Sequence, residues 1–152
     1  MGKFRIFLAA GLLLGGALFA SAQDKGYWRA ASSAANSITG DIAIAPTRLT
    51  INFSSFPLAE IRRLTPAEVS AVFAADINAG ANGDLYRLKI PAEKRFLHHN
   101  TLCGTDETEW MATYVSGREL RVAFFSGSTT PQMTIDAMNN SSSLCGVFTY
   151  SR

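Results

Sequence analysis

Residues 110–124 read WMATYVSGRELRVAF and predict a β-hairpin. On one side of the first strand the alternate residues are Trp110, Ala112 and Tyr114. Side chains that alternate with a period of two are typical of an extended strand. Ser116-Gly117 supplies a turn, and the returning strand begins with the alternate apolar residues Leu120, Val122 and Phe124. Two such runs joined by a Gly-containing turn favour antiparallel pairing.

The same alternation recurs on both sides of this hairpin. It is found over residues 38–44, 49–53, 86–90 and 144–150, and more weakly over 56–64. These runs give seven strands, or eight if residues 27–34 join the sheet. Antiparallel strands in that number must close or stack to hide their edges. The sequence therefore predicts a mainly β protein, a single-domain antiparallel barrel or sandwich of about seven to eight strands.

One short helix is expected after the weak strand. Thr65-Pro66-Ala67-Glu68 has the order of a capping box, with a hydroxyl that caps, a proline in the first turn and a glutamate three residues after the cap. Val69, Val72 and Phe73 follow at helical spacing, and Gly80 and Gly83 end the element. We expect this helix to pack beside the barrel or over one end.

The first 22 residues have the three parts of an export signal. Lys3 and Arg5 precede an uncharged apolar run over residues 6–19, and Ala20-Ser21-Ala22 matches the small-x-small pattern before a cleavage point. The run has 14 residues, fewer than the roughly 20 that a membrane span needs. Residues 1–22 are therefore predicted to be a signal peptide and residues 23–152 the single β domain. With no cysteine at the cleavage point, we expect a periplasmic or secreted protein without a lipid anchor or membrane span.

Net charge limits the classes of partner that the chain is expected to bind. The chain of 152 residues has 14 Lys+Arg and 12 Asp+Glu. Without Lys3 and Arg5, the 12 remaining basic residues match the 12 acidic ones. A neutral mature protein offers no charge argument for binding nucleic acid or an anionic membrane. We expect no nucleic-acid partner and no cofactor.

Both cysteines, Cys103 and Cys145, lie in the predicted mature part. In an oxidising compartment an even pair is most simply a disulfide. A catalytic thiol or a metal ligand is the alternative, although the chain has no CxxC spacing.

The residues that carry chemistry form no recognised catalytic set. His98 and His99 are the only histidines, and Asp106, Glu107 and Glu109 follow in the same loop. Adjacent strand residues point to opposite faces, so the two histidines would share a metal only from irregular backbone. A solvated polar loop is the alternative to a metal site. The sequence contains neither a G-x-S-x-G nucleophile motif nor a phosphate loop.

Aromatic residues are the remaining feature. Eight of them are placed to line the inside of a barrel, namely Tyr27, Trp28, Phe53, Tyr86, Trp110, Tyr114, Phe124 and Phe148. A hollow barrel lined in this way would hold a small apolar ligand. The ligand-binding residues that we predict are Trp28, Tyr86, Trp110, Tyr114 and Phe124. A core packed solid by the same side chains is the alternative.

One short motif, and separately the size and export of the chain, resemble features of known barrel families. Gly26-Tyr27-Trp28 resembles the G-x-W that opens the first strand of lipocalins, a family of eight-stranded barrels that bind hydrophobic ligands. Size, export and one disulfide also resemble the small periplasmic barrels that inhibit lysozyme. Those carry a Ser-Gly-x-x-Tyr loop, whereas residues 116–120 here end in Leu120. The resemblance implies an eight-stranded exported barrel.

These observations favour an exported non-catalytic binding protein, for a small apolar ligand or a partner protein. An inhibitor or immunity-type protein acting on a cell-wall hydrolase is a second hypothesis, with its contacts on loops such as 96–108 or 126–143. A metal-assisted enzyme that uses His98, His99 and the acidic run is a third.

Overall fold

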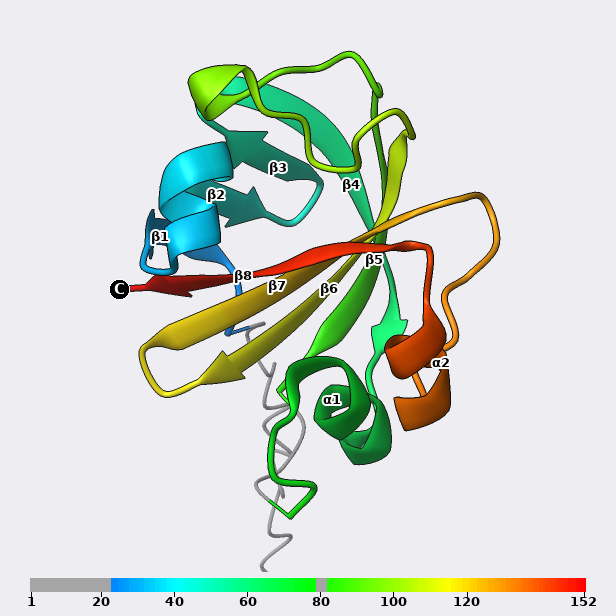
Figure 1. Cartoon of the computed structure of the whole chain (residues 1–152). Coiled ribbons are helices and arrows are strands. Elements are labelled where there is room, and N and C mark those ends of the chain that lie inside the picture. Colours follow the sequence, from blue (N-terminus) through cyan, green and yellow to red (C-terminus); the bar gives the residue numbers. More distant parts are fainter. Residues whose placement is uncertain (1–22, 79–81) are drawn as a thin grey trace, which may run out of the picture.

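The computed structural model describes residues 23–78 and 82–152, so the predicted signal peptide lies outside the described residues. Eight antiparallel strands follow one another around a closed barrel in sequence order (Figure 1). They are β1 (Gly26–Ala30), β2 (Ile42–Ala45), β3 (Arg48–Ile51), β4 (Ser54–Arg63), β5 (Asp84–Ile90), β6 (Thr108–Ser116), β7 (Glu119–Ser126) and β8 (Leu144–Ser151). The prediction of a mainly β, single-domain antiparallel barrel or sandwich is confirmed, the strands close into a barrel, and β1 is the eighth strand.

In the part of the chain that the structure describes, four short helical segments accompany the barrel, where one was expected. They are the π-helix η1 (Ala35–Thr39), α1 (Pro66–Phe73), the 3-10 segment η2 (Leu97–His99) and α2 (Ile135–Asn140). The strand predicted over residues 38–44 is wrong in its first half, because η1 continues to Thr39 and β2 begins only at Ile42. The preceding segment turns helical instead, and the Ser32 hydroxyl accepts a hydrogen bond from the Ala35 backbone N–H at 3.1 Å.

The predicted helix start is present in full at α1. The Thr65 hydroxyl accepts from the Glu68 N–H, and the Glu68 carboxylate accepts from the Thr65 N–H. Arg62, at the end of β4, donates to both Glu68 oxygens at 2.7 Å. These hydrogen bonds lower the pKa of Glu68 to about 2, with the Arg62 bonds as the main cause.

The up-and-down order gives the barrel two different ends. The end that carries the β1–β2, β3–β4, β5–β6 and β7–β8 connections is called the loop end below. The opposite end, called the terminal end, holds residues 23–25, Arg152 and the turns after β2 and β6. Gly117 makes the tight β6–β7 turn there, with a φ of 59° that suits glycine.

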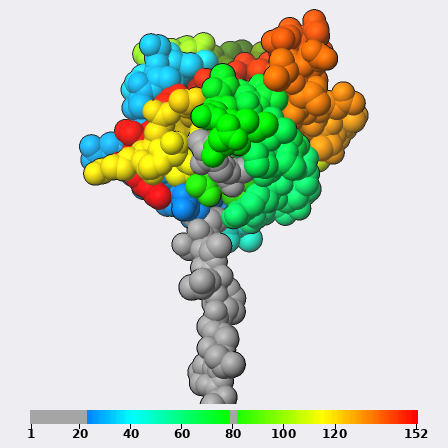
Figure 2. All heavy atoms as spheres, turned by 90° about the horizontal axis from the view of Figure 1, so that it is seen from below, coloured from blue at the N-terminus to red at the C-terminus, as the bar shows by residue number. Residues whose placement is uncertain are grey.

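Buried side chains form two clusters separated by the sheet wall. The larger one fills the barrel and draws residues from all eight strands. The smaller one lies outside β5, β6 and β7, where α1 and the segment before α2 cover the sheet. Figure 2 shows the orange α2 segment beside the green chain around α1 on the face seen from below. As a result β6 is buried on both faces from Trp110 to Val115.

None of the helices among the described residues is both long and apolar enough to cross a membrane.

Candidate functional site

Three of the five aromatic residues predicted to bind a ligand lie inside the barrel. Trp28, Tyr86 and Phe124 are each fully buried in the interior cluster. The Trp28 indole N–H donates to the Asp24 carbonyl at 2.8 Å, and the Arg152 guanidinium lies 4.2 Å from the centroid of the Trp28 ring. Phe124 packs edge-on against Phe148, with ring centroids 5.6 Å apart.

The other two predicted ligand-binding residues lie outside the wall. Trp110 and Tyr114 belong to the smaller cluster, where Tyr114 stacks on Phe73 of α1 at 5.8 Å between centroids. The Trp110 indole N–H donates to the Gly127 carbonyl at 3.0 Å. The five residues therefore do not line one space. Alternation had placed Trp110 and Tyr114 on one face correctly, but the face is the one that α1 and α2 cover.

The barrel interior is filled by side chains. Trp28, Ile51, Tyr86, Phe124 and Tyr150 are all completely inaccessible to solvent. A void large enough for a ligand would leave accessible surface on the side chains around it, as the lining of any water-sized cavity does. Close packing of this kind is the ordinary state of a protein interior.

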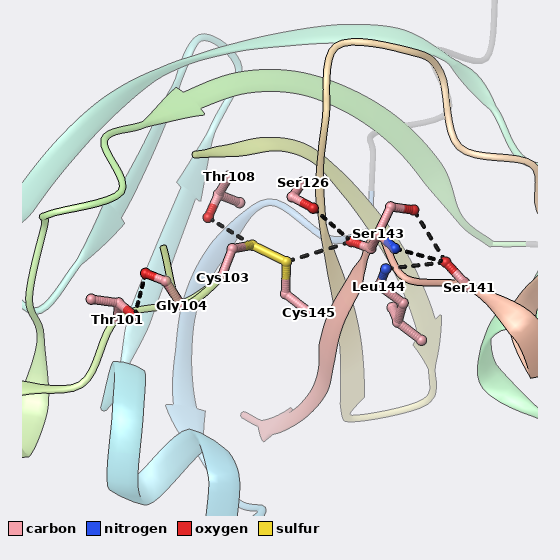
Figure 3. The surroundings of a disulfide bond; sticks show 9 residues. All are labelled: Thr101, Cys103, Gly104, Thr108, Ser126, Ser141, Ser143, Leu144 and Cys145. Atoms are coloured by element: carbon pink, nitrogen blue, oxygen red, sulfur yellow. Dashed lines mark hydrogen bonds between the residues drawn. A yellow bond between two sulfur atoms is a disulfide. The ribbon is translucent and has the colours of Figure 1, made fainter. Parts of the chain in front are cut away.

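The predicted disulfide joins Cys103 to Cys145, with the two Cα atoms 5.0 Å apart. It ties the β5–β6 loop to the start of β8 (Figure 3). The Thr108 hydroxyl donates to the Cys103 sulfur at 3.1 Å, and the Ser126 hydroxyl and backbone N–H donate to the Ser143 carbonyl beside the bridge. The disulfide therefore holds the long loop that covers the loop end.

His98 and His99 are exposed in η2, and both have left-handed backbone angles, with φ of 53° and 61°. The His99 carbonyl accepts from Arg95 at 2.8 Å. Within residues 23–78 and 82–152, no three His, Cys, Asp or Glu side chains come together to hold a metal ion. The geometry therefore gives the metal-assisted hypothesis no ligand set.

A buried polar network lies at the terminal end. The Asp24 carboxylate is almost fully buried and accepts from the hydroxyls of Tyr86 and Thr113 at 2.6 and 2.8 Å. Lys25 also reaches this carboxylate, at 3.5 Å. Burial and the hydrogen bond to Asp24 raise the pKa of Tyr86 far above its usual range. The network fastens the segment just before β1 to the barrel wall.

Asp84 lies beside this network and is 4% exposed. Burial raises its pKa from 3.8 to about 6, with the Asp24 charge as the next cause. The Arg63 guanidinium, 3.8 Å away, compensates only in part. Because the folded protein holds this proton more tightly than the unfolded chain, the contribution of Asp84 to stability falls as the pH rises from about 4 to about 6 and is constant above that range.

We expect Asp84→Asn to be more stable than the wild type at pH 7 by about 2–3 kcal/mol, since one pKa unit is worth about 1.4 kcal/mol. The difference should shrink to less than about 1 kcal/mol at pH 4, where Asp84 is protonated in the folded protein and partly protonated in the unfolded chain. Urea unfolding at a series of pH values measures it, with Glu93→Gln, an exposed change, as control. A gain that stays the same at pH 4 and pH 7 would show that charge is not the cause.

The β3–β4 turn presents the most exposed large apolar side chain among the described residues. Ile51 pairs with Ser54, so Asn52 and Phe53 form a two-residue turn, with φ of 44° and 67°. Positive φ at both positions is the pattern of a type I′ hairpin turn, where Asn followed by Gly is preferred. Phe53 is 99% exposed. A bulky side chain in the left-handed region costs about 1–2 kcal/mol, and burial recovers none of that here.

This position corrects the sequence prediction, which placed Phe53 on a strand and inside the barrel. Tyr27, predicted to line the interior as well, faces outward and is 58% exposed. The signal for the turn was Asn52, which favours the left-handed region. The alternation of Leu49, Ile51 and Phe53 hid that signal.

A shallow hollow of about 230 Å³ lies between Phe53 and Tyr27 on the outer face of β1, β2 and β3. The lining residues are Tyr27, Asp41, Ile42, Ala43, Thr50, Asn52 and Phe53. Tyr27 pairs across the sheet with Ala43, and Ala43 pairs with Thr50. Because alternate side chains share a face, two small side chains form the floor between two aromatic walls.

The Tyr27 wall is held in place. Its hydroxyl donates to the Asp41 carboxylate, which also accepts from the Ala30 N–H at 2.9 Å. These bonds lower the pKa of Asp41, with the Tyr27 bond as the main cause. A fixed aromatic wall loses less freedom when it binds something. Phe53, Tyr27 and this hollow together are called the Phe53 surface below.

Comparison with protein-family models, with curated proteins and with solved structures finds no match to this chain. The candidate site therefore depends on the geometry alone.

Proposed function

We propose that this chain is an exported, non-catalytic binding protein that docks onto a partner protein through the Phe53 surface. The observation that carries the proposal is Phe53 itself, fully exposed on a turn where its backbone conformation is unfavourable. Backbone strain of this kind concentrates at functional sites. Aromatic side chains, phenylalanine among them, are also enriched at protein interfaces.

The packing of the interior favours a protein partner over a small apolar ligand. A ligand inside the barrel would have to displace side chains such as Phe124 and Tyr150, which are fully buried. Removing such aromatic packing costs about 3–5 kcal/mol for each side chain. The outer Phe53 surface is already open, and its walls need no rearrangement.

Export is part of the proposal. Residues 1–22 have the composition of a signal peptide, and a disulfide is typical of proteins outside the cytosol. We also infer a lipocalin-like barrel from Gly26-Tyr27-Trp28 at the start of β1 and the eight-stranded order. The Ser116–Leu120 turn, compared above with inhibitor loops, lies at the terminal end, opposite the β3–β4 turn.

Photo-crosslinking tests the proposal. A benzophenone analogue of phenylalanine at position 53 should form a protein adduct in the compartment to which the chain is exported. The same analogue at Ile135, which is 65% exposed on α2, serves as the matched control and should not. Unlabelled wild-type protein should suppress the adduct at a concentration at least thirtyfold lower than the Phe53→Gly variant needs. A thirtyfold difference in affinity corresponds to the loss of a hot-spot side chain worth about 2 kcal/mol.

The Phe53→Gly variant should fold well. Glycine suits the second position of a type I′ turn, so we expect its free energy of unfolding to equal or exceed that of the wild type by up to about 1 kcal/mol. Urea unfolding checks this. Adducts that are equally frequent at both positions, or competed equally by both proteins, would contradict the proposal.

A further inference from the structure

We propose that the partner of the Phe53 surface is a second copy of this chain, bound about a twofold axis. This inference rests on the proposed function and names the partner at the same site. Each copy would place its Phe53 ring in the hollow of the other. The two Phe53 side chains would then lie side by side near the axis, each close to the other copy's Tyr27.

The first argument is that a protruding side chain and a hollow lie next to each other on one surface. Phe53 forms one wall of the hollow and also projects fully into solvent. In a twofold dimer the same surface of both subunits meets itself, so a projection needs an adjacent hollow on its own subunit. The Phe53 surface meets that requirement.

The second argument is size. The hollow measures about 230 Å³ and is open to solvent on one side, whereas an enclosed cavity of roughly 150 Å³ binds a whole benzene molecule. The space between the Tyr27 and Phe53 side chains above Ala43 and Thr50 is therefore of the size that one face of a phenyl ring needs. The floor offers a methyl group and a threonine side chain, which present apolar surface to the ring.

The third argument is charge. Without residues 1–22 the chain has 12 basic and 12 acidic residues, so two copies have no net repulsion to overcome. At the edge of the surface, the Asp41 carboxylate lies within electrostatic reach of Arg29.

A concave site also distinguishes this partner from a lipid surface. A side chain that inserts into a membrane gains from a convex tip, and a hollow beside the tip adds nothing to insertion. The hollow contributes only when something of matching shape enters it. Binding to vesicles is therefore one outcome that would overturn the inference.

Sedimentation equilibrium of the purified residue 23–152 protein, from 1 to 500 μM, tests the inference. We expect a monomer–dimer equilibrium that Phe53→Gly weakens at least thirtyfold. Ala43→Arg, which puts a charge into the hollow on the outer face, should weaken it to a similar extent. Ile135→Ser, on the exposed face of α2, should leave it unchanged.

Cross-linking of the purified protein locates the contact. The benzophenone analogue at position 53 should link to peptides that contain Tyr27 or Thr50, and a mixture of isotopically light and heavy protein should give mixed pairs. A monomer at every concentration would overturn the inference, and so would a dimer that survives both Phe53→Gly and Ala43→Arg. Binding of the purified protein to anionic vesicles in a Phe53-dependent way would overturn it too.

The two proposals fail differently. If the purified protein is a monomer while position 53 still forms competed adducts with another polypeptide, the second-copy inference falls and the proposed function stands. If position 53 forms no specific adduct under either condition, both proposals fall.

Discussion

Replacing both Cys103 and Cys145 by serine should lower the free energy of unfolding by up to about 4 kcal/mol. The bridge spans 42 residues, and the loss of loop-closure entropy in the unfolded chain for that span gives this figure as an upper value. Few single changes in a domain of this size are expected to cost more. Urea unfolding of oxidised protein, compared with the double variant, measures the effect.

Hydrogen exchange tests whether the disulfide stabilises the protein by restricting the unfolded chain. If the disulfide acts on the unfolded chain, protection should fall for the central strands β6 and β7 as much as for the β5–β6 loop. Wild-type protein in reductant provides the matched control and should behave like the double variant. A change of less than about 1 kcal/mol, or a loss of protection confined to residues 96–107, would contradict the entropic account.

The second large effect is expected at Trp28. Trp28→Ala should cost about 3–5 kcal/mol, the usual range for removing a fully buried aromatic side chain. The change also removes the ring on which Arg152 stacks, and with it the indole bond to the Asp24 carbonyl. The neighbouring Tyr27→Ala, whose side chain is more than half exposed, should cost less than about 1 kcal/mol.

Unfolding by urea distinguishes the two adjacent aromatic residues. Equal costs at positions 27 and 28 would mean that β1 does not separate an inner from an outer face. Arg152→Met keeps the length of the side chain but removes the guanidinium over the Trp28 ring together with its hydrogen bonds to the Gln23 and Lys25 carbonyls, so a partial loss would measure these contacts jointly. Such cation–π contacts contribute about 0.5–2 kcal/mol.

Much of the fold followed from local patterns. Alternation predicted the β5, β6, β7 and β8 strands, because a strand presents every second side chain to one face. The capping box at Thr65 predicted the start of α1, because those hydrogen bonds form between residues close in sequence. The disulfide was predictable from an even number of cysteines.

The candidate site was less accessible to sequence reasoning. A period of two says that Trp28 and Tyr27 face opposite ways, but it does not say which faces the interior. In β6 both faces are apolar, and only the packing of α1 shows that Tyr114 is outside the barrel. Phe53 continues the apolar alternation of Leu49 and Ile51 in the sequence. In the structure, however, β3 ends at Ile51, and Asn52 and Phe53 form the turn that follows.

The sequence by itself therefore determined the strand period, the capped helix, the paired cysteines and the balance of charge. Each of these depends on residue type or on neighbours a few positions away. Only the tertiary structure decided which aromatic side chains fill the barrel and which remain outside it. It also decided that Phe53 stands beside a hollow, because the pairing register of β1, β2 and β3 places Tyr27, Ala43 and Thr50 side by side on one outer face.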